Sequence, residues 1–250
     1  MLFIRSLLFI VGFVVLNTLW FVLSLPALLL PYNAFIRVIA HPWANSNMWL
    51  FGKIIGVTQE IRGLEHLPKG GYLVACKHQS AWETLALSAL VPGPTYILKR
   101  ELQWIPLFGL YLWKARSVAI DRGKGSAVLS RMNMAAKAAI DEGRQMLIFP
   151  EGTRRPVGAE PRYKYGVAHL YHETGATCIP MAHNAGVVWP RYGFIKYPGH
   201  IVLEILPPIP PGLTRDAFFE RMKSDIEEAT NRLVADTRRT AKTHQKDIRV

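Results

Sequence analysis

The chain is organised around one stretch, Tyr72–Glu83, which reads YLVACKHQSAWE. Its first half is a short apolar run preceded by two glycines, a pattern typical of a buried β-strand. After Glu83 apolar residues recur at helical spacing, so the stretch predicts a strand, a tight turn and a helix. His78 falls in the turn, at the carboxyl end of the predicted strand, where open α/β sheets form their ligand crevices.

The turn has two interpretations that the local sequence leaves open. In the first, His78 takes and returns a proton near neutral pH, and Glu83 folds back to hold its imidazole in one tautomer. In the second, Ser80 and Glu83 form the S-x-x-E pattern of a helix capping box, which accounts for both residues without catalysis. The rest of the chain has to decide between them.

The composition indicates a membrane-associated protein with an anionic partner. Half of the 250 residues are hydrophobic, and the formal net charge is +12. A positive charge of this size favours nucleic acid, anionic lipid head groups or phosphorylated substrates. The two cysteines, Cys76 and Cys178, each lie inside an apolar run, which predicts buried thiols rather than a disulfide.

Residues 1–58 are predicted to form a membrane-anchoring helical hairpin. The run Leu7–Leu30 is almost wholly apolar and long enough to cross the hydrocarbon core of a bilayer. A cleaved signal peptide is disfavoured, because the run is too long and no small-x-small cleavage site closes it. The next stretch, Tyr32–Val57, is more polar and predicts an interfacial helix with Trp43 and Trp49 at head-group depth.

The basic residues that flank the apolar run predict its orientation. Arg5 lies before the run, and Arg37 and Lys53 lie after it. By the positive-inside rule, this distribution favours a hairpin that enters from the cytoplasmic face. We therefore expect a membrane protein whose following domain lies on the cytoplasmic side.

Residues 59–212 predict an α/β domain with a mostly parallel sheet flanked by helices, because short apolar runs alternate with helical periodicity. The tail, residues 213–250, predicts an amphipathic helix from about Arg215 that packs on the domain. Its apolar stripe consists of Phe218, Met222, Ile226 and Leu233. The expected strands are Leu73–Cys76, Ser117–Ile120, Met146–Phe149, Thr177–Met181 and Ile201–Ile205, and the expected earlier helices are Leu85–Leu90, Ala127–Ile140 and Lys164–His172.

Cations follow several of these elements. Arg122 and Arg154 each follow a predicted strand, and Gly152 allows close approach of the backbone to a ligand. Lys164 lies at an expected helix start, where free N–H groups and the helix dipole favour phosphate. If the strands are parallel, their carboxyl ends meet at one edge of the sheet. A base beside several cations suits a substrate that is deprotonated at one end and held by phosphate at the other, although each cation alone also fits an ordinary surface charge.

Taken together, these residues resemble the glycerolipid acyltransferase family, specifically 1-acyl-sn-glycerol-3-phosphate acyltransferases. The resemblance covers about residues 60–206 and rests on motifs in the family's order: His78–Glu83 for H-x4-D, Ile120–Arg122 for I-D-R, Phe149–Arg154 for F-P-E-G-T-R and Ile179–Pro180 for the fourth motif. Two residues depart from the pattern. Glu83 stands where Asp is usual, and Lys77 stands where Asn often precedes the histidine.

The resemblance implies a function and a role for each motif residue. His78 would act as the general base on the hydroxyl of 1-acyl-sn-glycerol 3-phosphate (lysophosphatidic acid) as it attacks a thioester, giving phosphatidic acid, and Glu83 would orient His78. The implied phosphate ligands are Arg122, Arg154 and Lys164, and the implied acceptor pocket consists of Glu151, Gly152 and Thr153.

The implied partners are membrane lipids and the two substrates. The thioester, acyl-CoA or acyl carrier protein, is a co-substrate, and no cofactor or metal is implied. Glycerol 3-phosphate or another lysolipid remains an alternative acceptor.

Three other functional patterns are weaker. His169, His172 and Glu173 form H-x-x-H-E, but no further ligand set accompanies them, so no metal site is expected. The apolar strand around Cys76 predicts an inert thiol rather than an acyl acceptor. Nucleic-acid binding would account for the charge but not for the apolar N-terminus or the strand-end acid, and no base-stacking motif is present, so no nucleic acid partner is expected.

Overall fold

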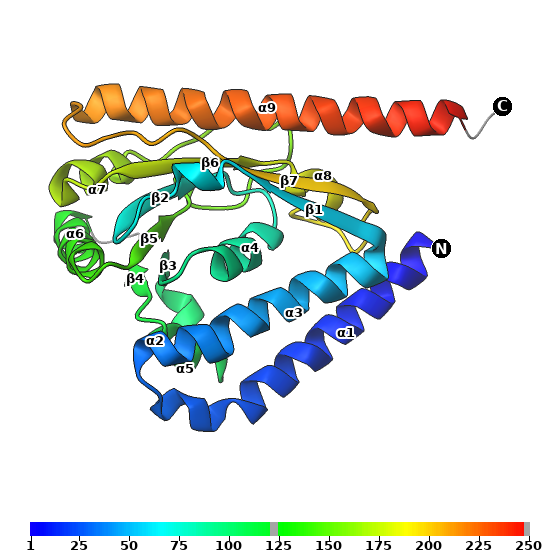
Figure 1. The fold of residues 1–250 in the computed structure, drawn as a ribbon, viewed down its shortest axis with the longest axis horizontal. Coiled ribbons are helices and arrows are strands. Elements are labelled where there is room, and N and C mark those ends of the chain that lie inside the picture. The colour runs from blue at the N-terminus through cyan, green and yellow to red at the C-terminus, as the bar shows by residue number, and fades with distance from the viewer. Residues whose placement is uncertain (121–124, 248–250) are drawn as a thin grey trace.

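The computed structural model describes residues 1–120 and 125–247. Within these residues a seven-stranded sheet lies between two layers of helices (Figure 1). The order across the sheet is β1-β7-β6-β2-β5-β3-β4. The strands are β1 (Val57–Arg62), β2 (Tyr72–Cys76), β3 (Pro94–Lys99), β4 (Val118–Ile120), β5 (Gln145–Ile148), β6 (Cys178–His183) and β7 (Gly199–Ile205).

The predicted, mostly parallel sheet is confirmed, with one exception. Strand β2 pairs in parallel with β5 and β6, and β3 pairs in parallel with β5 and β4. Strand β7 runs antiparallel to β6, and β1 runs parallel to β7. Strands β6, β2, β5, β3 and β4 therefore run in the same direction, and their carboxyl ends meet at one edge of the sheet, as the site prediction requires.

Strands β1 and β3 were not predicted from the sequence. Strand β1 lies at the edge of the sheet and mixes polar with apolar residues, so it lacks a continuous apolar run. Strand β3 begins with Pro94 and contains only a brief apolar run before Lys99. Both strands are defined by their pairing with distant partners, β7 for the first and β4 and β5 for the second.

The predicted helices are present with shifted ends. Lys164, which was expected to begin a helix, precedes α7, because this helix begins at Gly166. The α-helices are α1 (Leu2–Leu23), α2 (Tyr32–Phe35), α3 (His41–Phe51), α4 (Trp82–Leu90), α5 (Phe108–Lys114), α6 (Gly125–Asp141), α7 (Gly166–Thr174), α8 (Ala185–Val188) and α9 (Arg215–Asp247). Wider or tighter helical turns are η1 (Leu25–Leu29), η2 (Ile36–Ala40), η3 (Gly52–Gly56), η4 (Leu64–His66) and η5 (Arg100–Trp104).

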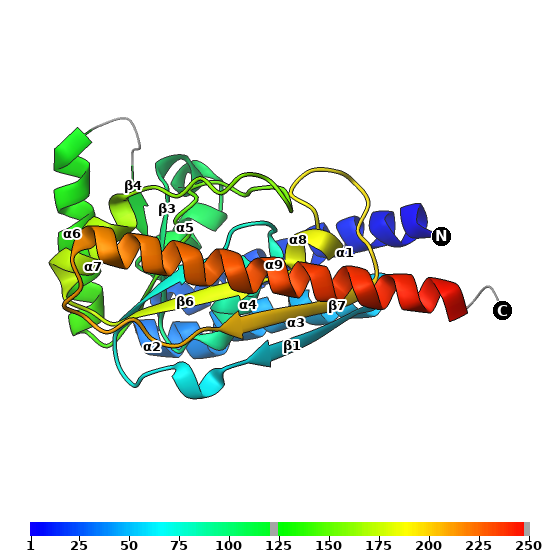
Figure 2. The same ribbon diagram turned by 90° about the horizontal axis from the view of Figure 1, so that it is seen from above.

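Strand β2 is buried on both of its faces. Leu73 and Ala75 point into a core shared with α6, α7 and α9, whereas Val74 and Cys76 point into a core shared with α4 and the N-terminal helices. Figure 2 shows α9 running lengthwise over the sheet. All four residues of its predicted apolar stripe are buried, and burial of each such side chain is worth about 1.5–3 kcal/mol.

Residues 1–56 form a helical hairpin that packs along the α/β domain (Figure 1). Phe9 of α1 and Phe51 of α3 both contact Trp189, with ring centroids 5.1 and 4.8 Å apart. The two legs are joined by hydrogen bonds to Asn17: its Nδ2 donates to Asn47 (2.9 Å), and the indole of Trp43 donates to its Oδ1 (2.7 Å). Trp43 is thus used inside the hairpin.

The hairpin leads directly into strand β1, which begins at Val57. Its first leg, α1, is long and apolar enough to cross a membrane, and few of its residues are buried in the protein. On the second leg, Trp49 is 62% exposed.

Candidate active site

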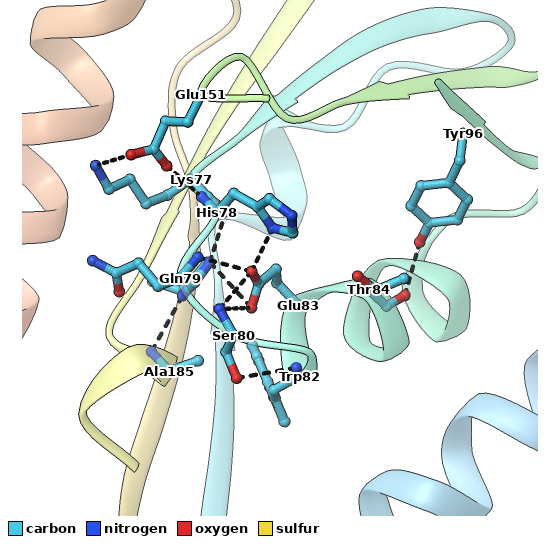
Figure 3. Close-up of polar contacts among 11 residues, drawn as sticks. Lys77, His78, Gln79, Ser80, Trp82, Glu83, Thr84, Tyr96, Glu151 and Ala185 are labelled. Atoms are coloured by element: carbon cyan, nitrogen blue, oxygen red, sulfur yellow. Dashed lines mark hydrogen bonds and ion pairs between the residues drawn. The ribbon is translucent and has the colours of Figure 1, made fainter. Parts of the chain in front are cut away.

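His78 and Glu83 meet in the turn between β2 and α4. The Nδ1 atom of His78 lies 2.8 Å from Oε1 of Glu83 (Figure 3). The same carboxylate accepts the backbone N–H groups of Gln79 (2.9 Å) and Ser80 (2.8 Å). The contacts that each interpretation requires of Glu83 are therefore both present, because one carboxylate accepts N–H groups ahead of α4 and also contacts the imidazole. Ser80 contributes separately, since its Oγ accepts the N–H of Trp82.

The electrostatics of Glu83 determine which nitrogen of His78 carries the proton. Burial on its own raises the pKa of the Glu83 carboxyl, but the imidazoles of His183 and His78 and the N–H of Ser80 outweigh it, and the pKa lies below its usual value. An ionised Glu83 accepts a hydrogen bond from Nδ1–H of His78, which leaves the lone pair of the neutral ring on Nε2. The His78 ring also stacks on Phe149, with ring centroids 4.0 Å apart. This second contact helps to fix the orientation of the imidazole.

His183, which the sequence reading did not include, lies behind this pair. It is fully buried at the end of β6, with Nε2 2.8 Å from the carbonyl of Lys77 and 3.7 Å from Oε2 of Glu83. Its Nδ1 accepts the N–H of Ala185 (3.2 Å). Burial lowers the pKa of His183, and this pair of contacts fits the neutral ring with the proton on Nε2. His183 thereby holds the Lys77 peptide next to His78.

A buried charge cluster holds the other side of the turn. The ammonium of Lys77 bonds Glu151 (3.0 Å) and Glu227 of α9, and the second oxygen of Glu151 accepts the N–H of His78 (2.8 Å). Tyr163 donates its hydroxyl to Glu227 (2.8 Å). Burial raises the pKa of Glu151 despite the attraction of Lys77. Figure 3 shows Glu151 directed at Lys77 and at the His78 backbone.

This cluster explains why lysine precedes the histidine. A lysine at position 77 is only 3% exposed, and two carboxylates compensate its charge. Glu151, which the resemblance assigned to the acceptor pocket, thus supports the turn and does not line the cavity described below.

A cavity of about 560 Å³ opens beside His78, within the size range of small-molecule sites. One part is lined by aromatic and aliphatic side chains of the hairpin, including Trp20, Phe21, Phe35, Ile36 and Trp43. The opposite wall comes from β3, η5 and α5. The polar part is lined by His78, Lys99, Gly152, Thr153, Arg154 and Arg191. The lining of the cavity therefore combines the imidazole with basic side chains and a large apolar surface.

Among the predicted cations that the structure describes, Arg154 lines this cavity. It is partly buried, and no carboxylate among the described residues pairs with it. Gly152 adopts a φ of 68°, a backbone conformation that favours glycine and lets the loop after β5 turn past His78. Arg191 joins Arg154 in the lining and donates to Thr153 Oγ1 (3.2 Å).

Of the other two predicted phosphate ligands, the structure describes only Lys164. The side chain of Lys164 is exposed and is not part of the cavity lining, while its backbone N–H donates to the carbonyl of Pro150 (2.8 Å). Arg122 lies outside the described residues. Arg191 and Lys99 occupy the polar lining instead, and no local pattern in the sequence distinguishes Arg191 from a surface cation.

The weaker patterns correspond to no assembled site in the described part of the chain. No three His, Cys, Asp or Glu side chains are placed there to hold a metal together. His172 and Glu173 instead form a surface cluster with Arg215. Cys76 and Cys178 are both free and buried, as predicted, and burial raises the pKa of each thiol.

Comparison with known proteins gives the same family as the motifs. A sequence model described as "Acyltransferase" matches residues 58–184. A 1-acyl-sn-glycerol-3-phosphate acyltransferase of Pseudomonas aeruginosa is 38% identical over 179 residues, which are 72% of this chain and 70% of the relative. The human 1-acyl-sn-glycerol-3-phosphate acyltransferase alpha is 30% identical over 65% of this chain, and the matched part spans 59% of the human protein, less than two thirds of its length.

A solved structure supports the fold. The crystal structure of a 1-acyl-sn-glycerophosphate acyltransferase, PlsC, from Thermotoga maritima aligns with a TM-score of 0.74. The alignment covers 92% of this chain and 98% of that one at 23% sequence identity. The hairpin, sheet and covering helices therefore form an arrangement already known from a solved protein.

Proposed function

Because this chain belongs to the acyltransferase family, we propose that it transfers a fatty acyl group from a thioester to the free hydroxyl of 1-acyl-sn-glycerol 3-phosphate, giving phosphatidic acid. One observation carries the proposal: His78 is oriented by a buried carboxylate and lines a cavity whose wall combines basic side chains with a large apolar surface. The names of the relatives support the same acceptor.

His78 acts as the general base through Nε2, because Nδ1 is bonded to Glu83. Nε2 removes the proton from the acceptor hydroxyl while the oxygen forms a bond to the thioester carbonyl carbon. The tetrahedral intermediate then collapses, the C–S bond breaks, and the departing thiolate takes the proton from Nε2. The ionised Glu83 stabilises the imidazolium between these steps, and general-base help of this kind contributes about 10²–10⁴-fold.

Arg154 binds the phosphate of the acceptor, with Arg191 and Lys99 beside it. A guanidinium suits this role, because its planar array of donors matches phosphate oxygens in a bidentate manner. The aromatic and aliphatic lining from the hairpin receives an acyl chain. The thioester, on coenzyme A or acyl carrier protein, is a co-substrate, and His78 alone carries out both proton transfers.

The protein is membrane-associated, and its substrates are lipids. We place the α/β domain on the cytoplasmic face, because Arg5, Arg37 and Lys53 flank the apolar run of the hairpin. Protease added to sealed right-side-out vesicles should leave this domain intact and should cleave it in inverted ones. Cleavage of the domain in right-side-out but not in inverted vesicles would contradict the proposed orientation and would leave the proposed activity unaffected.

A panel of acceptors and donors in mixed micelles, followed by release of free thiol, tests the activity. We expect the highest kcat/KM with lysophosphatidic acid, above glycerol 3-phosphate and lysophosphatidylcholine. His78→Ala should lower kcat at least about 10²-fold, whereas His172→Ala, an exposed histidine on α7, should leave it unchanged.

Two results would count against different parts of the proposal. If His78→Ala keeps more than a small fraction of kcat while the fold is intact, His78 is not the base. If another acceptor gives a higher kcat/KM, the acceptor is wrong and the base is unaffected.

A further inference from the structure

The exposed side of α1 is apolar except at Thr18. Six residues spaced at the helical repeat are between 47% and 61% exposed: Ile4, Leu8, Val11, Val15, Leu19 and Val22. The other side packs on the domain, from the buried Phe9 to Trp20 and Phe21 at the cavity. Because α1 lies along the domain, a bilayer that covers its exposed side must also approach the elements beside it.

A second exposed apolar surface lies on residues 99–116, which comprise η5 and α5. Trp104 is 74% exposed and Trp113 is 70% exposed, and Leu102, Ile105 and Leu110 are exposed as well. The same segment carries four basic residues, Lys99, Arg100, Lys114 and Arg116, and one acidic residue, Glu101, and of these Arg116 pairs with Glu142 (2.8 Å). Tryptophan combined with lysine and arginine is the composition found where proteins meet lipid head groups.

The 99–116 segment is fixed to the end of the hairpin. Tyr111 of α5 is buried, and its hydroxyl donates to the carbonyl of Phe21 (2.8 Å) and lies 2.9 Å from Oγ of Ser24. Figure 1 shows α5 beside this end of the hairpin. Gly109 packs so closely on η5 that a Cβ there would lie 2.0 Å from the carbonyl oxygen of Gln103. The exposed tryptophans are therefore held in a defined position relative to α1.

The same segment forms a wall of the cavity. Lys99, Leu102, Phe108 and Leu112 line it from this side, while Trp20, Phe21 and Phe35 line it from the hairpin. The cavity is thus lined in part by both α1 and the 99–116 segment, each of which has an apolar outer surface.

We infer that the 99–116 segment is a second membrane-contacting surface, which together with α1 seats the cavity on an anionic phospholipid bilayer. Continuity with α1 and the excess of basic residues identify the partner as lipid. A lipid then moves between the bilayer and the cavity without exposing its chains to water. The inference rests on the membrane association of α1 described above, so the test must separate the two.

Site-specific dye labelling makes that separation. Full-length protein carrying Trp104→Cys is labelled with an environment-sensitive dye and bound to vesicles of phosphatidylcholine and phosphatidylglycerol. Cys76 and Cys178 are fully buried, so the dye reacts with the introduced thiol. Ile4→Cys on α1 reports membrane association, and Leu64→Cys, at an exposed position in the β1–β2 connection, is the control.

We expect a nitroxide on the lipid chains to quench the dye at positions 104 and 4 but not at position 64. If position 104 stays accessible to aqueous iodide while position 4 is shielded, the inference is wrong, and the segment faces water or another protein. If position 4 is also accessible, the membrane association of α1 fails and the inference falls with it.

An activity assay gives an independent test. Trp104→Ala with Trp113→Ala should raise KM for vesicle-borne acceptor about tenfold, because binding of such surfaces scales with buried apolar area. Activity on a short-chain, water-soluble acceptor should not change, since neither tryptophan lines the cavity. The control pair, Leu64→Ala with Met134→Ala, removes two exposed apolar side chains elsewhere and should have no effect. Equal loss on both acceptors would overturn the inference.

Discussion

The polar lining of the cavity has two parts that are held in opposite ways. At the base end, which consists of His78 and the groups that hold it, the carboxylate that bonds His78 is fully buried and also accepts two backbone N–H groups, and His78 itself stacks on Phe149. At the cation end, which consists of Arg154 and Arg191, Arg154 has no carboxylate partner in the described chain, and Arg191 has one 3.2 Å hydrogen bond to Thr153.

The difference follows from what each end has to do. A general base contributes only when its lone pair points at the acceptor hydroxyl, so His78 benefits from contacts that are complete before substrate binds. A phosphate-binding cation must keep its donors for the substrate, so a strong internal partner would weaken it. Changes at the first end should therefore lower kcat, and changes at the second end should raise KM.

Glu83→Gln should have the largest effect on the base end. The side-chain amide can donate to Nδ1 of His78, which moves the ring proton to Nε2 and removes the lone pair from the acceptor. We expect kcat to fall about 10²–10⁴-fold with little change in KM. Glu83→Asp, which keeps the carboxylate, should retain more activity, and unfolding curves of both variants control for lost stability. Equal losses of kcat in the two variants would indicate that Glu83 only stabilises the turn and does not orient His78.

Lys77→Met should break the buried charge cluster behind His78. It leaves Glu151 and Glu227 facing each other without their cation, and breaking a buried ion pair costs about 3–5 kcal/mol. Urea unfolding measures this loss. Lys137→Met on the surface of α6, where the side chain is 55% exposed, should change the stability by less than about 1 kcal/mol.

Lys77→Met combined with Glu227→Gln should recover part of the loss, because one of the two uncompensated carboxylates is removed. Additive losses in the double variant would mean that the two residues do not act as a pair.

Arg154→Ala should act on the cation end. Losing a charge-assisted contact to phosphate costs about 1.5–3 kcal/mol, so KM for the phosphorylated acceptor should rise roughly ten- to a hundredfold. The KM for the thioester should change little. Arg162→Ala, at an arginine that is 72% exposed, provides the matched control. If only the KM for the thioester rises, Arg154 binds the thioester, and our assignment of the two subsites is reversed.

Replacement of His183 should have the smallest of these effects, a change in how the stability of the fold depends on pH. Its pKa is lowered in the folded protein, so below about pH 6.5 the unfolded chain binds a proton that the folded chain does not. Stability should fall on acidification through this range by at most about 1.4 kcal/mol per pH unit. His183→Gln, which keeps one donor and one acceptor, should remove this part of the slope in denaturant unfolding. An unchanged slope would mean that the pKa of His183 is the same in the folded and the unfolded chain.

Much of the base end could be predicted from the sequence, because its contacts are local. His78 and Glu83 are separated by five positions in the chain. A strand, a turn and a helix in that order return the second residue to the first, and apolar periodicity reveals all three elements. The stripe of α9 was predictable for the same reason, because one residue in every turn of a helix faces the same side.

Strands β1 and β3, the reversed β7 and the supports of the turn were decided by tertiary structure. His183 meets the carbonyl of Lys77 across 106 positions, and Glu227 meets Lys77 across 150. Arg191 likewise reaches Thr153 across 38 positions. Such contacts depend on which strands become neighbours and on where a distant helix lies over the sheet. Periodicity in the sequence reports which face of an element is buried, but the packing of the folded chain selects the residue that it meets.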